Sequence, residues 1–161
     1  MPRNSLTSRK QQPETHLPNS GTTHSITPLA KGLPTQPTLL LVDDDLAVRK
    51  GLGRVLAAEG WRVVSAANGE EALERLAELQ PDLMITDLRM VGVSGWDLLF
   101  HVNMQRPNLP IFVITALPPA AIGGADHFAA EFFPKPLDLD ALVMAIRRRL
   151  GVTQAMQPQQ Q

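Results

Sequence analysis

Short apolar runs alternate with longer amphipathic stretches along the middle of the chain. A continuous apolar run of about four residues is typical of a β-strand that is covered on both faces. Strands are predicted at residues 39–42, 62–65, 83–86 and 111–114, with a shorter one at 132–133. Five strands that alternate with helices predict an α/β fold: a doubly wound, five-stranded parallel sheet with right-handed crossovers and helices on both faces.

Four amphipathic stretches between these runs are predicted to be helices, because apolar residues recur every three or four positions. Asp45 is a candidate N-cap for the first helix, Asn68 for the second and Asp138 for the last. The third helix is predicted at residues 96–105. Gly151 follows the last apolar position and has the residue type that ends a helix.

The two ends of the chain lack this pattern. Residues 1–37 are rich in Ser, Thr, Pro, Gln and Asn, and residues 152–161 are rich in Gln. Such compositions bury too little apolar surface to offset the entropy of ordering. We therefore expect one folded domain, 38–151, between a disordered N-terminal extension and a disordered tail. The tail is too short for a DNA-binding or catalytic module, so a stand-alone domain is expected.

The composition narrows the classes of function. A net charge of −1 gives no general attraction for nucleic acid or an anionic membrane. The absence of Cys excludes disulfides, thiolate metal sites and Cys nucleophiles. No apolar run approaches the roughly 20 residues needed to span a bilayer, and no apolar stretch follows the basic N-terminus as in a secretory signal. We expect a soluble, cytoplasmic protein.

Polar residues follow the predicted strands, at the sheet edge where parallel α/β folds carry their functional sites. They are Asp43, Asp44 and Asp45 after the first strand, Asp87 after the third, Thr115 after the fourth and Lys135 after the fifth. Two carboxylates about 5 Å apart repel by about 3 kcal/mol at an effective dielectric of 20. A cluster of them therefore predicts a bound cation, and oxygen ligands with retained waters suit Mg²⁺.

Four segments together resemble the signature blocks of bacterial two-component response-regulator receiver domains. They read LVDDD at 41–45, ITDLRM at 85–90, ITA at 114–116 and KP at 135–136. The resemblance covers roughly residues 38–150. It implies the flavodoxin-like fold of stand-alone, CheY-like receivers, with strand order 2-1-3-4-5.

The resemblance also implies the chemistry of the site. Asp87 is the phosphoacceptor, which takes a phosphoryl group from a phosphohistidine on a histidine kinase or histidine phosphotransferase. Asp43 and Asp44, with Asp87 and the backbone carbonyl of Arg89, hold Mg²⁺. Lys135 pairs with the phosphoryl oxygens. Such a protein is no enzyme beyond self-catalysed phosphoryl transfer and autodephosphorylation.

Two further residues are implied to pass on the signal. Thr115 donates its hydroxyl to the phosphoryl group, and Phe132 stands at the place of the aromatic switch residue. Phosphorylation would then alter contacts with a downstream protein, with no nucleic-acid or membrane partner expected. The resemblance also implies a cis bond between Lys135 and Pro136.

Two departures from the family's pattern bear on this reading. Val91 stands where proline usually follows Met90, which predicts a less rigid loop after Asp87. The segment 118–127, where a fourth family helix is expected, is crowded by Pro118, Pro119, Gly123 and Gly124 and fits no clear element. That helix, the fifth strand and the last helix form the family's usual signalling and dimer face, so any dimer through it is expected to be weak.

Two alternatives remain open. The fold could serve as a docking module without phosphoryl chemistry. The aspartates at 43–45 also fit a haloacid-dehalogenase-like phosphatase, with Asp43 as nucleophile and Asp45 as acid/base. However, Ala47 stands where Thr or Val is usual in that family.

Overall fold

The computed structural model describes residues 36–122, 128 and 130–152. The segments predicted to be disordered lie outside these residues, apart from Gln36, Pro37 and Val152, each of which hydrogen-bonds to the folded part. Within the described ranges, no helix is long and apolar enough to cross a membrane.

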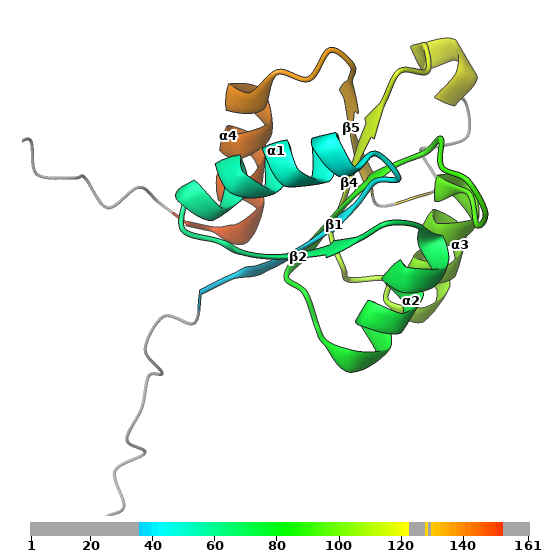
Figure 1. Ribbon diagram of the computed structural model, residues 1–161, viewed down its shortest axis with the longest axis horizontal. Helices are drawn as coiled ribbons and strands as arrows, with labels where there is room; N and C mark the ends of the chain where they lie inside the picture. The colour runs from blue at the N-terminus through cyan, green and yellow to red at the C-terminus, as the bar shows by residue number, and fades with distance from the viewer. Residues whose placement is uncertain (1–35, 123–127, 129, 153–161) are drawn as a thin grey trace, which may run out of the picture. The chain divides into compact units, whose positions relative to one another are not determined.

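A five-stranded sheet forms the centre of the domain (Figure 1). Its strands are β1 (Thr38–Val42), β2 (Arg62–Ala66), β3 (Leu83–Asp87), β4 (Ile111–Thr115) and β5 (Ala130–Pro134). All neighbouring strands pair in parallel, in the order β2-β1-β3-β4-β5. The predicted fold class and strand order are confirmed. The last strand is longer than its short apolar run had indicated.

Four α-helices cover the two faces of the sheet: α1 (Leu46–Ala58), α2 (Gly69–Glu78), α3 (Gly95–Gln105) and α4 (Leu139–Leu150). Figure 1 shows α1 and α4 on one face and α2 and α3 on the other. This is the doubly wound arrangement, which follows from right-handed crossovers between parallel strands.

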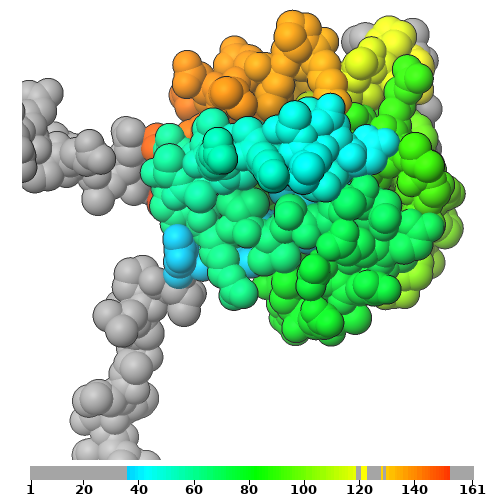
Figure 2. Space-filling view, in the orientation of Figure 1, coloured from blue at the N-terminus to red at the C-terminus, as the bar shows by residue number. Residues whose placement is uncertain are grey.

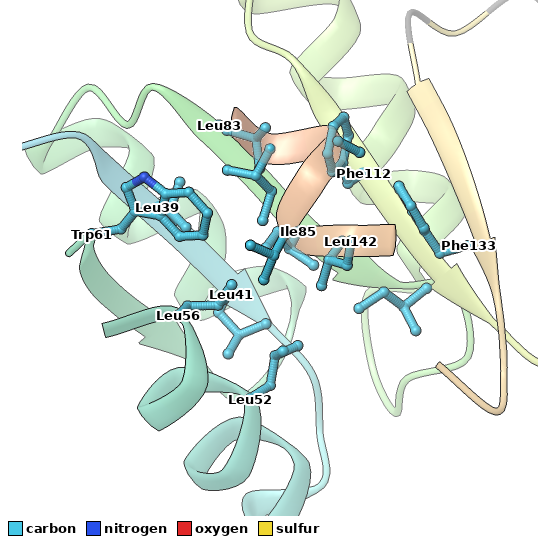
Figure 3. Close-up of a cluster of buried hydrophobic side chains, with 14 residues drawn as sticks. Leu39, Leu41, Leu52, Leu56, Trp61, Leu83, Ile85, Phe112, Phe133 and Leu142 are labelled. Atoms are coloured by element: carbon cyan, nitrogen blue, oxygen red, sulfur yellow. The ribbon is translucent and has the colours of Figure 1, made fainter. Parts of the chain in front are cut away.

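One core cluster lies between the sheet and the pair α1 and α4 (Figure 3). Alternate residues of the central strands, among them Leu39, Leu41 and Ile85, contribute side chains to it. The ring centroids of Phe112 and Phe133, both in this cluster, lie 5.1 Å apart. Figure 2 shows α4 in orange beside α1 in cyan. Arg147 of α4 forms an ion pair with Glu59, the residue that caps the C-terminus of α1.

A second cluster lies between the opposite face and α2 and α3. The other set of alternate strand residues, including Leu40, Val42 and Met84, packs there against Leu98 and Val102 of α3. Strands with both faces buried explain the continuous apolar runs of the sequence, because each face needs its own apolar set.

The predicted helix caps are confirmed. Asp45, Asn68 and Asp138 each accept from backbone amides of the first turn of their helix. Gly151 ends α4 with φ +66°, a left-handed conformation that glycine adopts without strain. A further cap, Ser94, was not predicted: its hydroxyl accepts from Asp97 N and starts α3 one residue earlier than expected.

The ambiguous segment 118–127 is described only as far as Ile122. There the chain forms one 3-10 turn, η1, over Pro119–Ile122. Pro118 and Pro119, at the start of the segment, disfavour an α-helix there, because proline restricts the backbone of the residue before it. Residues 123–127 lie outside the described part.

Candidate functional site

The strand register brings the polar residues of the sequence to one edge of the sheet. Val42, the last residue of β1, pairs with Ala66 on one side and Thr86 on the other. Asp43 therefore follows β1, next to Asp87 at the end of β3. Thr115 ends β4 opposite Pro134, and Lys135 follows directly.

Lys135 joins the two central carboxylates. Its ammonium nitrogen lies 2.5 Å from Oδ2 of Asp87 and 3.8 Å from Oδ2 of Asp43. Its backbone amide donates to the carbonyl of Thr115 over 2.8 Å, which fixes the start of this segment against β4. The bond between Lys135 and Pro136 is cis, as the resemblance had implied.

Burial and charge act in opposite directions on these groups. Desolvation raises the pKa of Asp43, aided by the negative charges of Asp87 and Asp44, although the Asp45 amide and Lys135 pull it down. Burial alone would lower the pKa of Lys135. The hydrogen bond and charge of Asp87, with the charges of Asp43 and Asp44, outweigh burial and raise it above its usual value. The site therefore favours a cation held among carboxylates.

Two of the site's carboxylates also receive backbone amides from the loop after β3. Oδ1 of Asp87 accepts from Arg89 N over 3.0 Å, and Oδ2 of Asp44 accepts from Val91 N over 3.4 Å. The Asp44 residue is exposed, whereas Asp87 is buried. The loop is thus attached to both ends of the acidic cluster.

Thr115 is almost wholly buried, and its hydroxyl oxygen accepts from Leu117 N over 3.1 Å. Phe132 is half-buried and packs against the second core cluster. Its neighbour Phe133 points into the first cluster instead. The roles of Thr115 and Phe132 in signalling stay predictions.

Among the described residues, no three acidic or His side chains lie in positions from which they could together hold a metal ion. The Lys135 ammonium contacts both Asp43 and Asp87, so it competes with a metal ion for their oxygens. The donor set nevertheless fits a hard divalent cation, since several carboxylate oxygens meet at one edge and burial disfavours the charge on Asp43.

Some contributors to the site carried no signal in the sequence. Arg49 of α1 donates through Nη1 to the carbonyl of Asp43 over 2.5 Å, which ties the acidic turn to the helix. Gly95 starts α3 so close to β3 that a Cβ there would lie 2.2 Å from the Asp87 carbonyl oxygen. Both depend on contacts between elements, which periodicity does not reveal.

Asp45 has a different environment from its two neighbours. Its carboxylate accepts from Ala47 N over 2.7 Å and from Val48 N over 3.3 Å. This confirms the predicted N-cap. The same contacts engage the side chain that the phosphatase alternative would use as acid/base.

Comparison with known proteins supports the resemblance. The family model of the response regulator receiver domain matches residues 39–147. The chain is 36% identical over 119 residues to the DNA-binding transcriptional regulator NtrC of Escherichia coli K12, covering 73% of this chain and 25% of that protein. It is 37% identical to the response regulator MprA of Mycobacterium leprae, covering 71% of this chain and 51% of MprA.

Solved structures agree. A response regulator receiver protein from Pseudomonas putida is 32% identical, with a TM-score of 0.68, covering 72% of this chain and 99% of that chain. Response regulator TrrA from Thermotoga maritima, solved in complex with Mg²⁺-BeF, is 29% identical with a TM-score of 0.65, covering 71% of this chain and 99% of that chain.

Proposed function

Because the chain belongs to the response regulator receiver domain family, we propose that it is a phosphoaccepting regulator of a two-component system or phosphorelay. Asp87 is the acceptor. The observation that carries this proposal is the contact of the Lys135 ammonium with Asp87 and, more distantly, with Asp43. Phosphoryl transfer needs mainly positioning and charge neutralisation, and this arrangement supplies both.

The proposed step needs one nucleophile and one leaving group. A carboxylate oxygen of Asp87 forms a bond to phosphorus, while the nitrogen–phosphorus bond of a phosphohistidine breaks and its electron pair returns to the imidazole. Lys135 neutralises the phosphoryl oxygens as they approach. The Arg89 amide holds Oδ1 of Asp87 and so orients the carboxylate. The phosphodonor would be a histidine kinase or a histidine phosphotransferase.

Asp43, Asp44 and Asp87, with the backbone carbonyl of Arg89, are the residues that would hold Mg²⁺. The ion would supply positive charge to neutralise the phosphoryl oxygens. Binding would require Lys135 to give up its contact with Asp43, whereas Asp44 could offer Oδ1 to the ion and keep Oδ2 on the Val91 amide. The Mg²⁺-BeF complex of the Thermotoga maritima relative supports this assignment by analogy.

Thr115 and Phe132 are the proposed route from the site to a partner. The Thr115 hydroxyl would turn toward the phosphoryl group, and Phe132, half-buried on the edge strand β5, would change its packing in response. The signalling domain would be residues 38–151, acting in the cytoplasm. Any dimer through the face of β5 and α4 would be weak.

Uptake of one phosphoryl group tests the proposal. Purified protein is incubated with acetyl phosphate and Mg²⁺, and its intact mass is compared with that of Asp87→Ala and of an EDTA-treated sample. We expect one added group on wild type only. Absence of uptake by wild type from both acetyl phosphate and a phosphohistidine protein, or equal uptake by Asp87→Ala, would reject it. Partner binding unchanged by Asp87→Ala would then favour a docking module.

A further inference from the structure

The loop between β3 and α3, residues 88–94, is held by carboxylates from three separate segments of the chain. Three alternate backbone amides of the loop donate to them: Arg89 to Asp87, Val91 to Asp44 and Val93 to Glu70. The first donor–acceptor distance is 3.0 Å and the other two are 3.4 Å, at the long end for such bonds. Two of these carboxylates belong to the proposed site, and Glu70 does not.

Glu70 lies in the first turn of α2, directly beside the loop. A Cβ on Gly69 would lie 2.6 Å from Cγ1 of Val93, so the start of α2 and the loop are in close contact. Both carboxylate oxygens of Glu70 would lie 3.3 Å from a Cβ on Gly92. Gly92 has φ +87°, a left-handed backbone at the point where the chain turns past Glu70. The carboxylate therefore lies against the turn of the loop at Gly92.

The Val91 contact depends on a departure from the family's usual sequence. Proline has no backbone N–H, so a proline at position 91 could not donate to Asp44. With Val91 in that place, the loop is linked to a proposed metal ligand through its own backbone. The loop that the sequence predicted to be less rigid thus has an additional attachment point.

We propose that Glu70 is a positioning residue for the phosphoacceptor site, which it serves without touching the reacting atoms. By accepting from Val93 N, it holds the loop so that the Val91 amide reaches Asp44 and the Arg89 backbone stays beside Asp87. Hydrogen bonds that orient a metal's ligands contribute strongly to metal affinity. The inference rests on the proposed function, since it names Asp44 and Asp87 as ligands.

The loss of this acceptor has a measurable consequence. Without it the loop is released at Val93, and Asp44 loses a fixed partner. We expect Glu70→Ala to weaken Mg²⁺ binding about three- to tenfold, the range of one ordinary hydrogen bond, because this bond is long and exposed. Glu70 is exposed, so the substitution removes few packing contacts and the domain should stay folded.

A charge effect has to be separated from positioning, because any nearby negative charge also attracts a cation. Glu70→Gln removes the charge but keeps an acceptor oxygen for Val93 N. Glu74→Ala removes an exposed glutamate from the same helix, one turn further from the loop. If Glu70 acts by positioning the loop, only Glu70→Ala should weaken Mg²⁺ binding by the full amount. If Glu70 acts by its charge, Glu70→Gln should weaken Mg²⁺ binding equally.

The experiment combines two measurements on wild type and these three variants. Amide hydrogen exchange of the metal-free proteins should speed up at Val93 and Val91 in Glu70→Ala alone. Calorimetric Mg²⁺ titration should give the three- to tenfold weakening in Glu70→Ala, with the other two variants within about twofold of wild type. Equal weakening in Glu70→Ala and Glu70→Gln, or unchanged exchange and affinity in Glu70→Ala, would overturn the inference.

The two proposals fail in different ways. If wild type itself does not bind Mg²⁺, the proposed metal site is wrong. The exchange rates of Val91 and Val93 in metal-free protein still decide whether Glu70 holds the loop. If wild type binds Mg²⁺ and Glu70→Ala binds it equally well, the metal site stands and the role of Glu70 is wrong.

Discussion

The ammonium nitrogen of Lys135 lies 2.5 Å from Oδ2 of Asp87, although 48 positions separate the two residues in sequence. The strand order explains the contact. Asp87 ends β3 and Lys135 follows β5, with β4 between them, so the long lysine side chain reaches across the end of one strand. This contact gives the acidic edge a positive charge of its own.

Removal of this positive charge should destabilise the metal-free protein. Lys135→Ala leaves the carboxylates of Asp87 and Asp43 without the positive charge that lies beside both. We expect the free energy of unfolding to fall by about 1–2 kcal/mol, less than for a fully buried pair because the lysine side chain is a third exposed. Urea denaturation at low ionic strength measures this.

The same variant should bind Mg²⁺ more tightly, because the ammonium no longer competes for the two carboxylates. Lys50→Ala removes an exposed lysine from α1 and serves as the control. Unchanged stability together with unchanged Mg²⁺ affinity in Lys135→Ala would contradict the role given to the lysine.

The raised pKa of Asp43 predicts a pH-dependent gain in stability for Asp43→Asn. Desolvation raises this pKa above 3.8 in the folded protein, so the folded state binds the proton more readily than the unfolded state. Ionised Asp43 therefore lowers stability at neutral pH. This loss is relieved as the pH falls through the folded pKa toward 3.8.

Asparagine removes the charge and keeps an oxygen for the Asp45 amide, which now donates to Asp43 over 2.8 Å. Without Mg²⁺ at neutral pH, we expect the variant to be more stable by about 0.5–2 kcal/mol. The gain should shrink to nothing as the pH approaches 3.8. Thermal unfolding of both proteins across this range measures it, and a gain that persists at low pH would show that charge is not its cause.

Gly95 and Gly51 form a matched pair of glycines at helical positions. A Cβ on Gly95 would lie 2.2 Å from the Asp87 carbonyl oxygen and 2.5 Å from the Leu88 Cα, both backbone atoms. We expect Gly95→Ala to lower stability by about 2–4 kcal/mol. Apart from the neighbouring residues and the backbone of α1 itself, no atom of the described residues lies within 4 Å of the equivalent position on Gly51, so Gly51→Ala should raise stability by up to about 1 kcal/mol. Equal effects of the two substitutions in urea denaturation would contradict this account.

Bound Mg²⁺ should stabilise the domain through its carboxylates. At a free concentration a hundredfold above its dissociation constant, a ligand of the folded state adds about 2.7 kcal/mol. Thermal unfolding should show this increase for wild type and its reversal by EDTA. Asp87→Asn should lose most of it, and an equal Mg²⁺ effect in that variant would place the ion elsewhere.

The fold was largely predictable because its signals are local. Strands buried on both faces require continuous apolar runs, and Asp45, Asn68, Asp138 and Gly151 cap their helices with contacts to nearby residues. The segment 118–127 resisted prediction because its prolines and glycines oppose an α-helix without specifying an alternative. The described part of it is a single 3-10 turn.

The site was predictable only in part. The positions of Asp43, Asp87 and Lys135 follow from strand ends meeting at one edge, so their convergence could be expected. The contributions of Arg49, Glu70 and Gly95 could not, because each depends on which backbone atoms of another element lie nearby. The Val91 position was noticed as a departure, but its amide contact with Asp44 needed the structure.

Chemical trapping of the phosphorylated residue tests the central claim most directly. After incubation with acetyl phosphate and Mg²⁺, borohydride reduction converts an aspartyl phosphate to homoserine, which peptide mass spectrometry locates. We predict homoserine at position 87 alone, and none when the phosphodonor or Mg²⁺ is omitted. Homoserine at position 43, as a phosphatase nucleophile would give, or unmodified Asp87 in protein that has taken up phosphate, would contradict the account.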